Sequence, residues 1–249
     1  MRVLVVLPTY NEAENISAIL EGVRQHLPEA SVLVVDDNSP DETAEIAEKT
    51  GELLGGIQVL RRPGKSGLGT AYRDGFSYGL ERGYEVLVEM DSDFSHDPAA
   101  LPSIVGPVEA GYDVVIGSRY VPGGSIPDWS LSRRLISRGG NLFAAAMLGF
   151  KVKDSTAGYR AYSASILRKV DLTSVRADSY GFQVEMTYRS LEAGGRLIEV
   201  PIRFVDRTLG TSKMSTYTVA EAFALVSLWG LKRIASRLGG GRRGGLRRP

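Results

Sequence analysis

Two carboxylates spaced two residues apart are the strongest chemical feature of this chain. Asp91 and Asp93 flank Ser92 directly after residues 84–90, a run whose pattern predicts a buried strand. Carboxylates placed where a strand opens into a loop can converge on one hard divalent cation. The remaining positions of such a cation are left for water or for the phosphates of a substrate. The same pattern also occurs in solvated turns, so its meaning depends on what the fold places beside it.

Further polar clusters follow other predicted strands. Short β-branched runs predict strands at residues 2–7, 31–35 and 57–60. The first two runs end in the polar segments 8–12 and 36–41. Predicted helices lie between the strands, one reaching to about Gln25 and one spanning 43–54. This alternation indicates βαβ units and a mostly parallel α/β sheet, in which ligands bind at the carboxyl ends of the strands. The acidic and polar clusters are expected to meet there.

Five segments extend this pattern in a fixed order: residues 7–12, 35–41, 67–71, 90–96 and 117–120. Together they resemble the family 2 inverting glycosyltransferases with the GT-A fold, and within that family the polyprenol-phosphate (dolichol-phosphate) mannosyltransferases. The resemblance implies a GT-A catalytic domain over residues 1–215, with a Rossmann-like, mostly parallel central sheet flanked by helices. We expect residues 216–238 to form an amphipathic helix and the Arg/Gly-rich residues 239–249 to form a flexible tail.

The resemblance implies a metal-dependent enzyme whose donor is a nucleotide diphosphate sugar. Asp93 and Ser95, together with Asp91, would contact the metal, while Asp91 and Ser92 would line the donor. Mg²⁺ or Mn²⁺ suits a site made only of oxygen ligands. Many relatives carry glutamine at the position of Ser95, so the choice between the two metals stays open.

The resemblance also assigns residues to the nucleoside and the diphosphate of the donor. The nucleoside would be held by Pro8, Tyr10, Glu12, Val35 and Asp37. Arg207 and Lys213 would close on the diphosphate, and Arg119 also belongs to the predicted donor-binding set. The alternative for residues 8–12 is a turn in which Asn11 caps the following helix. The two interpretations are compatible.

The acceptor implied by the resemblance is a polyprenyl phosphate. Its phosphate would be held by Arg119, Arg133 and Ser137. Arg133 and Ser137 are four residues apart on a predicted helix and therefore share one face. For any single arginine here, the alternative is a surface ion pair.

No general base is needed in this scheme, because a phosphate monoester is already anionic near neutral pH. The predicted catalytic residues are Asp91, Asp93 and Arg119, and His96 has no predicted role. Single inversion of an α-linked donor would give a β-mannosyl phosphate.

Composition limits the other possibilities. The chain of 249 residues has a net charge of +1 and no cysteine. Without cysteine, neither disulfides nor thiolate metal sites are available. The chain begins directly in a predicted strand, so we expect a cytoplasmic protein without a signal peptide. Five arginines lie in residues 237–249, which leaves the rest of the chain net negative and argues against nucleic acid as a partner. The longest apolar run, residues 222–231, is too short to span a bilayer. We therefore expect peripheral contact with a membrane surface or a separate membrane-bound partner.

Three alternatives to transfer from GDP-mannose remain. The same lipid acceptor could receive a sugar from UDP-glucose or from another sugar nucleotide. A binding or scaffold protein that has lost its chemistry would be expected to lack Asp91, Asp93, Arg207 or Lys213, yet all four are present. Nucleic-acid binding through the tail would be salt-sensitive and confined to that segment.

Overall fold

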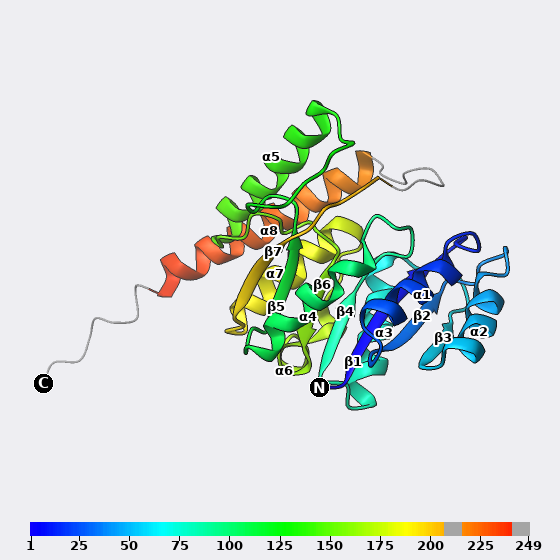
Figure 1. The fold of residues 1–249 in the computed structure, drawn as a ribbon. Coiled ribbons are helices and arrows are strands. Elements are labelled where there is room, and N and C mark those ends of the chain that lie inside the picture. The colour runs from blue at the N-terminus through cyan, green and yellow to red at the C-terminus, as the bar shows by residue number, and fades with distance from the viewer. Residues whose placement is uncertain (207–215, 241–249) are drawn as a thin grey trace, which may run out of the picture.

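The computed structural model describes residues 1–206 and 216–240. Its centre is a seven-stranded sheet with the strand order β3-β2-β1-β4-β6-β5-β7 (Figure 1). The strands are β1 (Val3–Thr9), β2 (Ser31–Asp36), β3 (Ile57–Arg61), β4 (Val86–Glu89), β5 (Val114–Ser118), β6 (Arg160–Ser163) and β7 (Leu197–Pro201). Only β6 runs antiparallel to its neighbours, β4 and β5. The prediction of a mostly parallel α/β sheet is confirmed.

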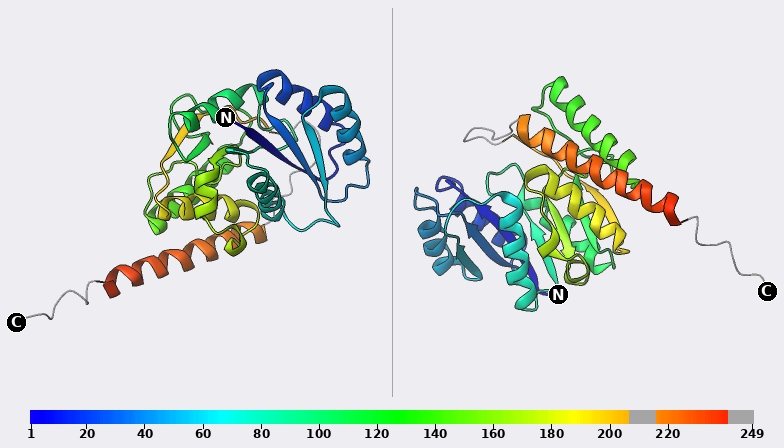
Figure 2. Two further views of the ribbon diagram at one scale, coloured as in Figure 1. Left: turned by 90° about the horizontal axis from the view of Figure 1, so that it is seen from below. Right: turned by 180° about the vertical axis from the view of Figure 1, so that it is seen from behind.

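Alternation along β1 places a hydrophobic core on each face of the sheet. Val3, Val5 and Leu7 belong to one buried cluster, and Leu4 and Val6 belong to the other. This is the two-residue period of a strand covered on both sides. The first cluster packs under α1 (Ile16–His26), α2 (Thr43–Leu54) and α4 (Leu101–Glu109). The second packs under α3 (Leu68–Glu81), α6 (Ala164–Lys169) and α7 (Ser179–Glu192). Figure 2 shows the sheet between these helices.

Three loops at the carboxyl ends of the strands contain non-glycine residues with positive φ. Asn11, Asn38 and Phe94 follow β1, β2 and β4 with φ values of 58°, 58° and 60°. Asparagine tolerates this left-handed region, whereas a bulky phenylalanine there is an outlier of the kind that gathers at functional sites. The predicted helix cap at Asn11 is wrong, because α1 begins only after Asn15. The turn itself is present.

Two long helices lie side by side at one end of the sheet, α5 (Leu131–Leu148) and α8 (Thr216–Gly240) (Figures 1 and 2). Gly230 permits the close approach, since a Cβ there would lie 2.6 Å from Met147 Cε. Arg233 Nη1 donates to the carbonyl oxygen of Met147 at 3.4 Å, near the left-handed Gly149 that ends α5. Within the described part of the chain, every helix is too short or too polar to cross a bilayer.

Candidate active site

The ends of β1, β2 and β4 bring three predicted donor residues together. Pro8 of β1 pairs in register with Val35 of β2. The hydroxyl of Ser92, in the loop after β4, donates to the carbonyl oxygen of Pro8 at 3.1 Å. Segments separated by more than 80 residues therefore form one rim, as expected for the carboxyl edge of a parallel sheet.

Asp37 has a partner that the sequence did not indicate. Its Oδ1 accepts a hydrogen bond from Arg62 Nη1 at 2.5 Å, and both side chains are almost fully buried. Arg62 Nε also pairs with Asp74 at 3.0 Å. Burial raises the pKa of Asp37, and this effect outweighs the opposing attraction of Arg62. Arg62 follows β3 directly. This position at the carboxyl end of a strand was the one feature of the sequence that could have indicated Arg62 as a site residue.

Tyr10 and Glu12 occupy the same rim. The ammonium group of Lys65 lies 4.5 Å from the centroid of the Tyr10 ring, a cation–π contact. Glu12 Oε2 accepts from Asn15 Nδ2 at 2.9 Å, so part of its hydrogen-bonding capacity is used locally. Lys65 thus brings a positive charge to the predicted nucleoside site.

The Asp91 loop is held from two sides by fully buried residues. The hydroxyl of Tyr72, on α3, donates to Asp91 Oδ1 at 3.2 Å. The backbone N–H of Asp91 donates to His96 Nδ1 at 3.0 Å, which requires that nitrogen to be unprotonated. Burial lowers the pKa of His96 despite the nearby carboxylates, and burial also raises the pKa of Tyr72. Both groups therefore stay neutral near pH 7, and each can form its bond to Asp91.

A third carboxyl group, that of Glu89, precedes this loop in the sequence. Glu89, at the end of β4, is fully buried, and burial raises its pKa to about 8 against the attraction of Arg160. Glu89 is therefore mostly protonated at neutral pH. This leaves Asp91 and Asp93 as the acids of this segment that can present negative charge to a cation.

Asp93 and Ser95 fit a divalent metal ion. Asp93 is 6% exposed, and its Oδ1 accepts from the backbone N–H of Ser95 at 3.0 Å. The hydroxyl oxygen of Ser95 is buried and has no hydrogen-bonding partner among the residues that the structure describes, so it is available to a ligand. No group of three or more acids, histidines or cysteines gathers around a common point in the described residues. Carboxylate and hydroxyl oxygens that leave positions for substrate phosphates suit Mg²⁺ or Mn²⁺.

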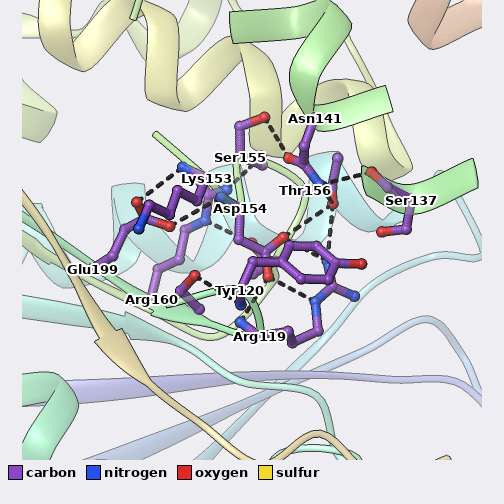
Figure 3. A network of polar contacts seen from close by, with 12 residues as sticks. Arg119, Tyr120, Ser137, Asn141, Lys153, Asp154, Ser155, Thr156, Arg160 and Glu199 are labelled. Carbon is purple, nitrogen blue, oxygen red and sulfur yellow. Dashed lines mark hydrogen bonds and ion pairs between the residues drawn. The ribbon is translucent and has the colours of Figure 1, made fainter. Parts of the chain in front are cut away.

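Arg119 emerges from β5 into a buried ion pair with Asp154 (Figure 3). Arg119 Nε and Nη2 donate to the two oxygens of Asp154 at 2.8 and 2.6 Å, and the backbone N–H of Arg119 adds a third bond at 2.9 Å. Arg119 Nη2 also donates to Thr156 Oγ1 at 2.9 Å. Burial opposes ionisation of Asp154, but the charge and hydrogen bonds of Arg119 outweigh it and lower its pKa. The pair fixes the guanidinium plane of Arg119.

The same network anchors α5 to the loop that carries Asp154 (Figure 3). Asn141 of α5 donates through Nδ2 to Thr156 Oγ1 at 3.1 Å and accepts from Ser155 Oγ at 2.9 Å. On the other side, the carboxylate of Glu199 in β7 accepts the backbone N–H of Asp154 at 2.9 Å. The positions of Arg119 and of α5 are therefore set by one connected set of hydrogen bonds.

A cavity of about 330 Å³ brings together the three residues predicted to hold the acceptor phosphate. Its lining is formed by Arg119, Trp129, Ser132, Arg133, Ile136, Ser137, Gly140, Phe143, Ala144, Thr156, Val184, Phe223 and Val226. Arginines and hydroxyls lie among the lining residues beside a larger apolar set from α5, α7 and α8. Phe143 and Phe223 face each other across α5 and α8 with ring centroids 4.8 Å apart. The cavity can take an amphiphile with an anionic head and an apolar body.

Arg133 has a carboxylate partner in this cavity wall. Its Nη1 pairs with Asp206 Oδ2 at 2.6 Å, and its guanidinium lies 3.9 Å from the centroid of the Trp129 ring. Trp129 and Asp206 were not predicted from the sequence. The two remaining predicted cations, Arg207 and Lys213, lie outside the described residues.

The amino-acid sequence is similar to a known enzyme family and to two named relatives. A model of the glycosyl transferase family 2 matches residues 4–171. The undecaprenyl-phosphate mannosyltransferase of Micrococcus luteus is 51% identical over 231 residues, covering 93% of this chain and 95% of that protein. The polyprenol monophosphomannose synthase of Mycolicibacterium smegmatis is 45% identical, covering 93% of this chain and 88% of that protein.

Solved structures share the fold. Glucosyl-3-phosphoglycerate synthase from Mycobacterium tuberculosis, in complex with Mn²⁺, UDP and glucosyl-3-phosphoglycerate, has a TM-score of 0.65 at 20% identity, over 93% of this chain and 79% of that one. A mannosyltransferase from Pyrobaculum calidifontis, in complex with GDP-Man and Mn²⁺, has a TM-score of 0.54 at 16% identity, over 99% and 76%. The resemblance inferred from the five sequence segments is confirmed by the family match and the two relatives, and the chain belongs to glycosyl transferase family 2.

Proposed function

We propose that this protein transfers mannose from GDP-mannose to polyprenyl phosphate, giving polyprenyl β-mannosyl phosphate and GDP. The observation that carries the proposal is the cavity between α5 and α8, which joins Arg119 and Arg133 to a mostly apolar lining. This combination of arginines and apolar side chains matches the polarity of a lipid phosphate. The names of the two close relatives, both enzymes of polyprenyl-type phosphate and mannose, support the same acceptor and sugar.

On the donor side, Asp91, Asp93 and Ser95 would hold Mg²⁺ or Mn²⁺. When bound, the ion neutralises negative charge that develops on the diphosphate as the glycosidic bond breaks. Tyr72 and His96 keep Asp91 in place for this task. Pro8, Val35 and Ser92 form the rim on which the nucleoside would lie.

On the acceptor side, an oxygen of the phosphate monoester attacks the anomeric carbon while the bond from that carbon to the diphosphate oxygen breaks. The second pKa of a phosphate monoester is about 6, so the nucleophile is already deprotonated near neutral pH. Asp154 cannot serve as a base, because both of its oxygens are bound by Arg119 and its pKa is lowered. Catalysis then rests on positioning and on electrostatic stabilisation.

The test of this function is the transfer of radiolabelled mannose from GDP-mannose into organic-extractable lipid, with added polyprenyl phosphate and Mg²⁺ or Mn²⁺. We expect a mannolipid that is lost when EDTA removes the metal. Labelled lipid formed from UDP-glucose but not from GDP-mannose would support the proposed acceptor and show that the donor is UDP-glucose. No labelled lipid from either donor, with folded protein, would contradict the proposed function.

The location that we propose is peripheral, on the cytoplasmic face of the membrane. Large apolar side chains are exposed along the two helices that border the cavity: Leu131, Leu135, Ile136 and Leu142 on α5, and Phe223, Leu228, Leu231 and Ile234 on α8. Arg134, Lys232 and Arg233 lie among them in the sequence, so headgroups of anionic lipids would be attracted to the same helices. A separate membrane-bound partner is the alternative anchor.

Binding to vesicles checks this location. Leu135 and Leu231 are each 61% exposed, so replacing both by serine should leave the fold intact. We expect the partition of the protein into vesicles with anionic lipid to fall at least tenfold, since each buried leucine contributes about 1.5–3 kcal/mol. Leu53→Ser, at an 86% exposed leucine on α2, is the matched control and should bind as the unaltered protein does. Equal binding of all three proteins would place the membrane contact on another surface of the chain, and no binding by the unaltered one would favour the partner protein.

A further inference from the structure

Two hydrogen-bond donors of the cavity converge on one carboxylate. Asp206 Oδ2 accepts from Arg133 Nη1 at 2.6 Å, and Asp206 Oδ1 accepts from the indole Nε1 of Trp129 at 3.0 Å. Trp129 and Arg133 both line the cavity, and Asp206 follows β7 in the sequence. A planar guanidinium and an indole N–H aimed at the same pair of oxygens form a small anion-binding site.

The surroundings of this site are positively charged and rigid. The guanidinium of Arg119 lies 5.2 Å from the centroid of the Trp129 ring and 5.5 Å from that of Phe204. The ring of Phe204 packs edge-on against Trp129 with centroids 5.7 Å apart. The backbone N–H of Phe204 donates to the carbonyl oxygen of Ser125 at 2.9 Å, which fixes the segment leading to Asp206. The carboxylate is thus held against Arg133 by an anchored backbone.

We propose that Asp206 occupies the place that the acceptor phosphate takes, so that the substrate must displace this internal carboxylate, and that the Trp129 indole N–H then donates to a phosphate oxygen. This inference rests on the proposed function and adds to it a phosphate-binding residue and an internal competitor. Neither residue belongs to the set that the sequence predicted for the acceptor.

Displacement is favourable on physical grounds. The side chains of Arg133 and Asp206 are 29% and 39% exposed, and ion pairs with this access to water are weak. A phosphate monoester carries close to two negative charges and three acceptor oxygens, whereas Asp206 carries one charge. The carboxylate therefore screens the arginines from weaker anions while a phosphate monoester still enters. Freed from Arg133, the carboxylate can turn toward water at its partly exposed position.

The experiment measures binding of farnesyl phosphate, a soluble prenyl monophosphate, by titration calorimetry on the full chain. Asp206→Asn removes the competing charge, and we expect Kd to fall roughly three- to fivefold, the value of an exposed ion pair. Trp129→Phe keeps a ring beneath Arg133 but removes the N–H, and we expect Kd to rise about tenfold. The same directions are expected for the KM of undecaprenyl phosphate, with the KM of the sugar nucleotide unchanged.

Asp128→Asn is the matched control, because it removes the same charge at an exposed position beside Trp129. Its Kd should stay within about twofold of the unaltered protein. An equal fall of Kd in Asp128→Asn and Asp206→Asn would reduce the effect to general electrostatics and overturn the proposal. Unchanged or weaker binding by Asp206→Asn would also overturn it, as would an unchanged Kd in Trp129→Phe.

Failure of the proposed function can be distinguished from failure of this inference. If the unaltered protein makes no polyprenyl-linked sugar, titration with inorganic phosphate still tests the anion site. Tighter phosphate binding by Asp206→Asn than by Asp128→Asn would then support displacement of the carboxylate by a phosphate from another source. Equal phosphate binding by the two variants would overturn both the competitor and the site.

Discussion

Asp93→Asn is expected to lower kcat for mannolipid synthesis by about 10²- to 10³-fold, the usual loss when a group that stabilises transition-state charge is removed. Asparagine has nearly the same shape and can still accept the backbone N–H of Ser95 through Oδ1. The loop should therefore stay folded while the site loses one negative charge. The measurement is kcat as a function of Mn²⁺ and Mg²⁺ concentration, with thermal unfolding recorded in parallel.

A neighbouring acid provides the control for this prediction. Asp97 is exposed and caps the short helical turn Pro98–Ala100 by accepting the backbone N–H of Ala99 at 2.9 Å, a bond that asparagine can keep. Asp97→Asn changes the same loop by the same charge and should leave kcat within about twofold. A large, equal loss in both variants would point to general damage of the loop. Activity of Asp93→Asn close to that of the unaltered enzyme would remove Asp93 from the metal site.

The parallel strands at the start of the chain were predictable from the sequence, whereas the antiparallel strand β6 was not. The strands β1, β2 and β3 were identified from apolar runs, because strands buried on both faces consist of such runs. For β6, the sequence lacks the apolar run on which such a prediction depends. Its four residues, Arg160–Ser163, include a fully buried arginine, and no apolar run marks them. Arg160 is held by the carbonyl oxygens of Ala157, Gln183 and Ser155, contacts that only the tertiary structure supplies.

The candidate site shows the same limit. Residue types and spacing pointed to Asp91 and Asp93, and the family resemblance pointed to Arg119 and Arg133. Their partners were invisible, since a hydrogen bond across 35 residues, such as that between Arg119 and Asp154, leaves no local pattern. Among these partners, Tyr72 came closest to being predictable, because it directly follows the segment 67–71 that carried part of the resemblance.

Asp154→Ala is expected to be the most destabilising of the proposed changes, at about 3–5 kcal/mol, because it leaves the buried guanidinium of Arg119 without its partner. Arg119 is 6% exposed and Asp154 is fully buried, so water from the cavity can replace only part of the lost bonds. The measurement is the free energy of unfolding from urea denaturation. A loss below about 1 kcal/mol would mean that Arg119 finds another partner or reaches solvent.

Activity lost in Asp154→Ala would be ambiguous, because an unfolded enzyme is also inactive. The double variant Arg119→Met with Asp154→Leu separates the two effects. The double variant leaves no buried charge unpaired, although the backbone N–H of Arg119 loses its acceptor, so it should be more stable than Asp154→Ala and should fold. It should nevertheless have kcat/KM for polyprenyl phosphate reduced by at least about 10²-fold, since the cavity that we propose for the acceptor has lost one of its lining guanidinium groups. Activity near that of the unaltered enzyme would assign Arg119 a purely structural role.

The pH dependence of stability provides an independent check on the same pair. The pKa of Asp154 is lowered below its usual 3.8 in the folded protein, so its contribution to stability is fully present above pH 3.8. That contribution is lost as the pH falls through the lowered folded pKa, because protonation then removes the charge that Arg119 needs. The unaltered protein should therefore lose stability more steeply below about pH 3.8 than the double variant, which has no carboxylate at this position. Parallel curves for the two proteins would show that another acid, and not Asp154, governs unfolding at low pH.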